Sequence, residues 1–275
     1  MKIKAHAKIN LTLDILGKRE DGFHELESVM QQLDLADDIT IVDLPNKKIT
    51  IECTGIPKKK NLVFKSVIFM RNKFKVEKGV KITIKKNIPV AAGLGGGSAD
   101  AAAVIKGLNK LWKLGLSEEE MVDFASDIGS DVPFSIMGGV AVAKGRGEKL
   151  HKIDGMPSFD VVVINPGFGI RTKEGYLNLD KKNYGQKRAT VKMLKDLSRD
   201  NIALNLHNDF EHSIFKKYPD LKEIKEELER QGADAAIMSG SGSSVFGIFK
   251  DKEEAKEAYD KLKGKYKFAF LTKTI

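Results

Sequence analysis

Residues 89–103 read PVAAGLGGGSADAAA, and this stretch organises the rest of the chain. Glycines stand at positions 93, 95, 96 and 97, and Ser98–Ala103 is typical of the first turns of a helix. Glycine adopts positive φ angles freely and lets a backbone approach a ligand closely. The N-terminus of the following helix offers N–H groups and the positive end of its dipole. The pattern predicts a phosphate-binding loop, with Ser98 as helix cap and its hydroxyl beside a bound triphosphate.

This loop differs from two common phosphate-binding motifs. It is not a P-loop, because no Lys-Ser or Lys-Thr pair follows the glycines. It is not a Rossmann fingerprint, because Ser98 stands where the third glycine belongs and no acidic residue follows a strand about twenty residues later. A helix N-terminus that is reached through a flexible turn, with no ligand, is the structural alternative.

The bulk composition restricts the class of protein. With 275 residues, 41% of them hydrophobic, the chain can bury one large core or two smaller ones. The 47 lysines and arginines exceed the 38 aspartates and glutamates by 9, which fits attraction either to nucleic acid or to a small polyanionic substrate. The basic residues are dispersed and only Lys58–Lys60 form a run, so no nucleic-acid-binding stripe is evident.

Cysteine content and hydropathy indicate the compartment. The one cysteine, Cys53, excludes an intramolecular disulfide and a multi-cysteine metal site. It lies in the strand-like run ITIECTG, where a buried apolar role is expected rather than a reactive thiol. The sequence shows no signal peptide and no apolar run of membrane-spanning length. We therefore expect a cytoplasmic protein.

The N-terminal strands carry the first candidate site residues. Apolar and polar residues alternate through the first 15 positions, which predicts strands with one buried face. Lys8 and Asn10 share the opposite face, where Lys8 is either an ordinary solvated residue or part of a site. The tight-turn signal Asp21-Gly22 then places Phe23 and His24 where an aromatic ring and an imidazole could meet a ligand. An edge strand with one packed aromatic residue is the alternative.

The rest of the first half is predicted to mix strands and helices. The periodicity indicates strands at 28–35, 38–44, 48–54, 80–85 and 138–144, and helices at 61–76 and 98–112. Asn61 is a possible cap of the first of these helices. A further helix begins near Leu116, with Ser117 as cap and Glu120 completing a capping box.

Asp131 lies in the segment IGSDVPF, where that further helix is expected to end. Gly129 fits a helix stop, and Pro133 is expected to prevent the helix from resuming. Asp131 is then held on a turn among apolar neighbours, where a carboxylate needs partners or water. It is either an ordinary turn residue or, with a phosphate loop in the same half, a general base.

The pattern breaks at Asp154–Ser158, and we expect two domains there, 1–155 and 156–275. Strands are predicted at 159–165, 233–238, 244–249 and 267–274, helices at 220–231 and 253–263, and loops with short helices over 170–217. This β-α-β-β-α-β order is that of a ferredoxin-like domain. The turn Ser239–Ser243, SGSGS, is either a simple hairpin connection or a glycine-rich wall beside the first loop.

Three separated stretches resemble the motifs of one superfamily, the GHMP kinases. They are KINL at Lys8–Leu11, the loop at Pro89–Ala103 and the late SGSGSSVFGIF. The resemblance spans nearly the whole chain and implies an α+β fold, with an N-terminal, ATP-binding domain like ribosomal S5 domain 2, a C-terminal ferredoxin-like domain and an active site between them. The segment AKINLTLDILGKREDGFHELESVMQQLDLAD, with IGSDVPFSIMGG and NDFE, is similar to one branch of the superfamily. That branch phosphorylates the C2 hydroxyl of a cytidine diphosphate-linked methylerythritol in isoprenoid precursor synthesis.

The resemblance implies a role for each matching residue. Asp131 matches the base of the family, and Lys8 matches the cation that holds this base ionised and stabilises the transferring γ-phosphate. ATP, with Mg²⁺ accompanying it and Ser98 as a candidate ligand, would be bound by Pro89, Ala92, Gly93, Leu94, Gly95, Gly96, Gly97 and Ser98. The substrate would be bound by Asn10, Phe23, His24, Thr172 and Tyr176. Among these, His24 would read the cytosine edge, and Phe23 and Tyr176 would stack on its two faces.

The sequence departs from the family pattern at several positions, and other functions have to be compared with the one that the resemblance implies. Phe23 stands where the family usually has Tyr, Arg146 stands where an apolar residue is common, and Ser243-Ser244 replaces Pro-Thr. The rivals are another GHMP kinase acting on homoserine or phosphomevalonate, a basic nucleic-acid-binding protein, and a catalytically inactive nucleotide sensor. The DGFHE context argues against another GHMP kinase. The dispersed charges argue against a nucleic-acid-binding protein, and the presence of both Lys8 and Asp131 argues against that protein and against an inactive sensor. A monomer or weak homodimer, without nucleic-acid or membrane partners, is expected.

Overall fold

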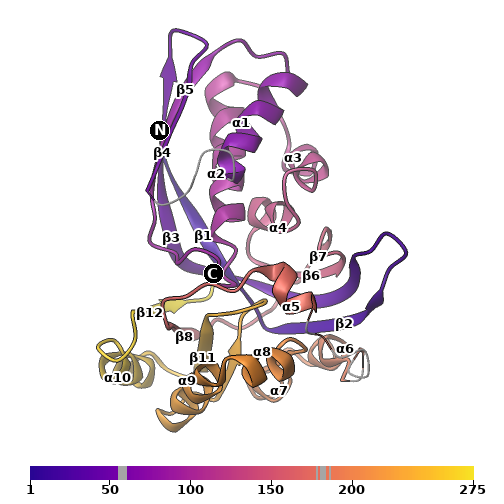
Figure 1. Ribbon diagram of the computed structural model, residues 1–275, viewed down its shortest axis with the longest axis vertical. Coiled ribbons are helices and arrows are strands. Elements are labelled where there is room, and N and C mark those ends of the chain that lie inside the picture. Colours follow the sequence, from indigo (N-terminus) through magenta and orange to yellow (C-terminus); the bar gives the residue numbers. More distant parts are fainter. Residues whose placement is uncertain (55–60, 178, 180–183, 186) are drawn as a thin grey trace. The chain divides into compact units, whose positions relative to one another are not determined.

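The computed structural model describes residues 1–54, 61–177, 179, 184–185 and 187–275 (Figure 1). The basic run Lys58–Lys60 lies outside these residues. The chain forms two compact units, each assembled from separate segments: unit 1 from Met1–Ala7, Leu35–Ile88 and Gly95–Gly138, and unit 2 from Lys8–Asp34, Pro89–Leu94 and Gly139–Ile275. The family domain limits expected from the sequence, 1–155 and 156–275, stay a prediction.

Unit 1 packs four helices with a small sheet. The strand β5 (Gly79–Lys85) pairs in parallel with β4 (Ile49–Cys53) and antiparallel with the Asp38–Leu44 part of β3 (His24–Leu44). The helices α1 (Leu62–Lys73) and α2 (Gly96–Trp112) lie side by side (Figure 1), and α3 (Glu118–Ala125) and α4 (Val132–Met137) pack on α2. Apolar side chains from the sheet and all four helices form one core, which includes Val67, Ile82, Ile105, Leu108, Phe124 and Ile136.

Local capping signals in unit 1 are mostly confirmed. Asn61 caps α1, since its Oδ1 accepts the N–H of Val63 at 2.9 Å. Ser117 and Glu120 form the expected capping box of α3. The prediction that Ser98 caps α2 is wrong: the cap is Gly95 at φ 68°, and Ser98 lies inside the first turn. Glycine reaches this left-handed φ without strain, so the helix begins before Ser98.

Three other predictions from local patterns are wrong. The helix α3 ends at Ala125 rather than near Gly129, and Pro133 lies in the first turn of α4, which begins at Val132, instead of preventing a helix. Proline has no N–H to donate, so it fits a first helical turn, where no bond is lost. Asp131 is therefore the residue that precedes α4. The strands expected at 28–35 and 38–44 are one continuous strand, β3. The charged residue Asp37 does not interrupt it, because the backbone N–H groups of Asn87 and Ile88 bind its carboxylate.

Unit 2 contains two groups of strands. In the first, the beginning of β3 pairs antiparallel with β2 and β6, β6 pairs with β7, and β2 pairs in parallel with β9. The bounds are β2 (Thr12–Lys18), β6 (Val140–Gly145), β7 (Lys149–Lys152) and β9 (His207–Asn208). The strand β1 (Lys2–Asn10) also pairs with β3.

The second group confirms the predicted ferredoxin-like order. Its four antiparallel strands lie in the order β10-β11-β8-β12, and α9 and α10 pack on this sheet. The bounds are β8 (Asp160–Asn165), α9 (Pro219–Arg230), β10 (Ala235–Met238), β11 (Val245–Phe249), α10 (Lys252–Leu262) and β12 (Phe268–Lys273). Short helices fill 170–217, as expected: α5 (Thr172–Leu177), α6 (Ala189–Met193), α7 (Arg199–Leu204) and α8 (Glu211–Lys217). No helix in the described part of the chain combines the length and the apolar character that a membrane crossing requires.

Candidate active site

The first half of the glycine-rich loop, Pro89–Leu94, is held in unit 2 by the serine- and glycine-rich turn between β10 and β11. The Ser239 hydroxyl donates to the Gly93 carbonyl at 2.9 Å, and the Ser244 N–H donates to the Ala92 carbonyl at 3.0 Å. The Lys8 N–H donates to the Leu94 carbonyl at 3.0 Å. The SGSGS turn therefore joins two strands and also forms a wall beside the loop.

Gly93 is required by this close contact. A Cβ on Gly93 would lie 2.0 Å from the Ser239 carbonyl oxygen, and the residue has a φ of +79°. We expect Gly93→Ala to raise the KM for ATP at least about tenfold. The added methyl group must push the loop away from the Ser239 carbonyl, and this shift displaces the backbone N–H groups expected to bind the phosphates. Steady-state kinetics at varied ATP concentration measure this.

Gly115→Ala is the matched control for Gly93→Ala. Gly115 has a similar φ of +72°, but a Cβ there meets nothing within 4 Å. The control carries only the backbone strain of about 1 kcal/mol and keeps its KM for ATP. An unchanged KM in Gly93→Ala, together with equal loss of thermal stability in both variants, would show that the loop does not depend on this contact.

The second half of the loop belongs to unit 1 and is the start of α2. The first intrahelical bond at this end joins the Ala99 N–H to the Gly95 carbonyl at 2.9 Å. The N–H groups of Gly96, Gly97 and Ser98 precede it, and the first N–H groups of any helix lack an intrahelical partner. A Cβ on Gly97 would meet only Leu62, at 4.0 Å. The backbone N–H groups of this turn can therefore bind an anion, and the dipole of the 17-residue helix favours negative charge there.

Lys8 is a buried cation and not the solvated residue that the alternating pattern also allowed. Lys8 lies on β1, and the residue is 6% exposed. Its Nζ donates to Oδ1 of Asn10 at 2.7 Å, and Nδ2 of Asn10 donates to Oγ of Ser28 at 2.8 Å. The Ser28 hydroxyl in turn donates a hydrogen bond to the Thr12 carbonyl at 2.5 Å. This relay fixes the ammonium group in one position on the strand.

Aromatic residues of unit 2 gather around His24. The His24 ring stacks on Tyr176 of α5, with centroids 4.7 Å apart and planes 16° apart, and its Nε2 lies 3.2 Å from the Tyr184 hydroxyl. Tyr176 in turn meets the Phe210 ring edge-on. Burial, and to a smaller extent the nearby positive charge of Lys18, lowers the pKa of His24. The imidazole is therefore neutral at pH 7 and offers both a donor and an acceptor.

Phe23 is exposed, and one of its faces is covered by Arg146. The guanidinium carbon lies 4.9 Å from the ring centroid, a cation–π geometry. The Arg146 backbone is held by Glu148, whose Oε2 accepts its N–H at 2.6 Å. This contact gives Arg146, which departs from the family pattern, a structural partner. The roles of Phe23 and Tyr176 in stacking on a base stay predictions.

The two remaining predicted site residues are Thr172 and Asp131. Thr172 is an exposed residue of α5, four positions before Tyr176, so both lie on one face of the helix. Asp131 is half-buried in unit 1, and its carbonyl accepts both the N–H and the hydroxyl of Ser135. Sequence reasoning missed Tyr184, because nothing local links a tyrosine to an imidazole 160 positions away.

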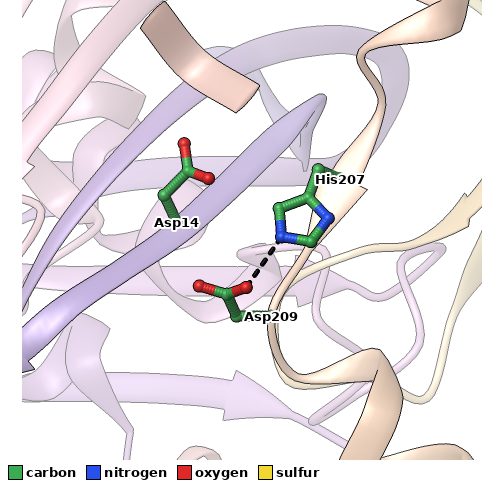
Figure 2. Close-up of side chains that lie close together, drawn as sticks. All are labelled: Asp14, His207 and Asp209. Atoms are coloured by element: carbon green, nitrogen blue, oxygen red, sulfur yellow. Dashed lines mark hydrogen bonds and ion pairs between the residues drawn. The ribbon is translucent and has the colours of Figure 1, made fainter. Parts of the chain in front are cut away.

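Another close cluster in unit 2 consists of Asp14, His207 and Asp209, whose possible ligand atoms lie within 4.8 Å of one another (Figure 2). Asp14 accepts the N–H groups of Ala189 and Thr190 at the start of α6. Asp209 accepts the N–H of Ile15 and bonds to Nε2 of His207 at 2.7 Å. These bonds join β2, β9 and α6, and we assign the cluster a role in folding rather than in metal binding.

Comparison with known proteins defines the class. Residues 61–139 match the model for the GHMP kinases N terminal domain, and residues 191–267 match the GHMP kinases C terminal model. The structure of a mevalonate kinase from Methanococcus jannaschii shares the fold at a TM-score of 0.77 with 16% identity, covering 100% of this chain and 98% of that one. The protein is thus a phosphotransferase of the GHMP type, with ATP as its co-substrate. The α+β two-domain fold class expected from the sequence is confirmed.

More similar proteins define the family. A 4-diphosphocytidyl-2-C-methyl-D-erythritol kinase of Caldanaerobacter subterraneus subsp. tengcongensis is 45% identical, over 100% of this chain and 97% of its own length. The enzyme of the same name from Thermoanaerobacter pseudethanolicus is 43% identical, over 100% and 96%. A crystal structure of 4-(cytidine 5'-diphospho)-2C-methyl-D-erythritol kinase superposes with a TM-score of 0.88 at 30% identity, covering 100% and 99%. The chain belongs to this family of GHMP kinases, as its motifs predict.

Proposed function

We propose that this protein transfers the γ-phosphoryl group of ATP to the C2 hydroxyl of 4-diphosphocytidyl-2-C-methyl-D-erythritol, giving the 2-phosphate and ADP in the non-mevalonate isoprenoid pathway. The observation that carries the proposal is the stack of His24 on Tyr176 in unit 2, with the exposed ring of Phe23 next to His24 in the chain. A small acyclic alcohol such as homoserine or mevalonate has no ring for these side chains to bind. The names of the full-length relatives support the same substrate.

The cluster suits a pyrimidine nucleotide. Exposed Phe23 and half-buried Tyr176 supply flat apolar surfaces on which a base can stack. Neutral His24, whose Nε2 lies 3.2 Å from the Tyr184 hydroxyl, has its Nδ1 left for the hydrogen-bonding edge of cytosine. Asn10 and Thr172 are proposed to contact the polar remainder of the substrate. Stacking and edge contacts together select a cytidine nucleotide over a free polyol.

Phosphoryl transfer needs positioning and charge stabilisation more than covalent chemistry from the protein. We assign Asp131 as the base that accepts the proton of the C2 hydroxyl, while the hydroxyl oxygen bonds to the γ-phosphorus and the bond to the ADP oxygen breaks. Lys8 stabilises the charge on the transferring group. The loop from Pro89 to Ser98 holds the phosphates with backbone N–H groups.

ATP is proposed to bring Mg²⁺ with it. The hydroxyl of Ser98 lies on the half-exposed first turn of α2, beside the N–H groups assigned to the phosphates, and oxygen donors are those that Mg²⁺ prefers. Ser98 is therefore the residue that we assign as a protein ligand. The ion would neutralise phosphate charge as the transfer proceeds.

The proposal predicts a strict choice of substrate. With ATP and Mg²⁺, ADP release is expected with 4-diphosphocytidyl-2-C-methyl-D-erythritol, and at least about 10³-fold lower kcat/KM with homoserine, mevalonate or phosphomevalonate, because these leave the aromatic cluster unused. A coupled assay measures ADP, and phosphorus NMR of the product locates the phosphate. Turnover with one of the other three alcohols, or a product phosphorylated away from C2, would refute the proposal.

A further inference from the structure

Three buried charged side chains lie behind the first turn of α2, all within unit 1. Lys86 follows β5, and its Nζ donates to Oδ2 of Asp37 on β3 and, at 2.8 Å, to Oδ2 of Asp100 on α2. The side chains of Asp37 and Asp100 are 0% and 3% exposed, and that of Lys86 is 14% exposed. A fixed cation thus links the sheet to the helix that begins the phosphate loop.

Asp37 also holds the chain that leads into the loop. Its Oδ1 accepts the backbone N–H of Asn87 at 2.6 Å and that of Ile88 at 2.8 Å. One carboxylate therefore fixes both the side chain of Lys86 and the next two residues of backbone. Charge-assisted bonds of this kind are roughly twice as strong as neutral ones.

Gly96 brings this cluster into direct contact with the phosphate-binding turn. A Cβ at Gly96 would lie 3.0 Å from the Ile88 side chain and 3.3 Å from Nζ of Lys86. The bare backbone of the first turn of α2 therefore packs on the ammonium group and on Ile88. A shift of Lys86 would be transmitted to the N–H groups of this turn.

Asp100 is the incompletely satisfied member of the cluster. Its Oδ1 is buried and lacks a hydrogen-bond partner among the described atoms. Burial raises the pKa of Asp100 to about 7, helped by the negative charge of Asp37 and opposed by Lys86. The pKa of the Cys53 thiol on β4 is also raised, chiefly by burial and to a smaller extent by the nearby carboxylates of this cluster. Asp100 thus depends on the Lys86 ammonium group to be buried as a carboxylate.

We propose that Lys86, Asp37 and Asp100 are positioning residues for ATP, which set the first turn of α2 for phosphate binding. The proposal rests on the part of the proposed function that places ATP phosphates on this turn. Lys86 joins β3 to α2 through the two carboxylates, so removing either end of this link lets the turn shift.

Asp100→Asn tests the helix end of the link, since asparagine keeps the shape of the side chain but not the charge that pairs with Lys86. Calorimetry with Mg²⁺ and ADP measures Kd for wild type and variant at one pH. We expect the variant to bind ADP at least about threefold more weakly, because a weaker bond to Lys86 lets the first turn of α2 shift. An unchanged Kd would overturn the proposal.

Lys86→Met tests the positioning. We expect the KM for ATP to rise about tenfold and the KM for the acceptor substrate to stay unchanged, because one anchored turn of helix is released. The control is Lys106→Met, which removes another half-buried lysine of α2 that lies outside the cluster. A rise in both KM values alike, or in neither, would overturn the proposal; if Lys86→Met does not fold, Asp100→Asn decides. Because the calorimetry needs no acceptor, a protein that binds ADP but fails to phosphorylate the cytidyl substrate would refute the proposed function alone.

Discussion

Asp131→Asn is expected to lower kcat about 10³-fold, within the range by which a positioned general base accelerates proton transfer. Asparagine has nearly the shape of aspartate, but its amide cannot accept the proton of the substrate hydroxyl. In the described helix α4 the Asp131 side chain makes no capping hydrogen bond, so the substitution removes no cap. The kcat should therefore fall while the melting temperature stays within a few degrees of the wild-type value. Single-turnover kinetics with saturating ATP and substrate measure the chemical step.

Asp127→Asn is the matched control for Asp131→Asn. Asp127 is an exposed carboxylate four residues earlier in the same segment, and the two variants change net charge equally. The control is expected to keep kcat within about twofold, since surface charges are screened at physiological salt. Equal turnover in the two variants, with both proteins folded, would remove Asp131 from the mechanism. Both KM values should change little in either case, because a base acts in the transition state rather than in binding.

The features that could be predicted from the sequence are those set by neighbouring residues. The capping box at Ser117 and the Asn61 cap each depend on residues within three positions, and the ferredoxin-like order follows from strands and helices that each show their own period. The glycine-rich loop could be predicted for the same reason. Even so, Ser98 was wrongly expected to be the cap, because the left-handed φ of Gly95 allows the helix to start earlier.

What the sequence alone could not show depends on distant partners. The pair Asp37-Asp38 looks like a break between two strands until Lys86, about fifty positions later, supplies the charge that lets Asp37 be buried. The stacking of His24 on Tyr176 likewise needs the path of the whole intervening chain. A single sequence contains the residue types for such contacts but not the strand register that brings them together.

Lys8→Met is expected to lower kcat about 10²-fold or more while leaving the protein at least as stable, a combination that distinguishes a functional charge from a structural one. Lys8 is nearly buried, and its ammonium group donates to Oδ1 of Asn10 at 2.7 Å. Burying a charge costs folding free energy, and an apolar side chain of similar length avoids that cost. If Lys8 served folding alone, replacing it with methionine would raise the stability of the protein at no cost to turnover.

Lys4→Met provides the control for Lys8→Met on the same strand. Lys4 is exposed and pairs with Asp38 at 2.7 Å, so its loss costs only the small free energy of a surface ion pair, less than about 1 kcal/mol, and is expected to leave turnover unchanged. Thermal unfolding and steady-state kinetics on the two variants separate the effects. If Lys8→Met kept wild-type turnover, the ammonium would not stabilise the transferring phosphoryl group. If it lost stability and turnover together, Lys8 would instead act through the Asn10–Ser28 hydrogen bonds that order the strands.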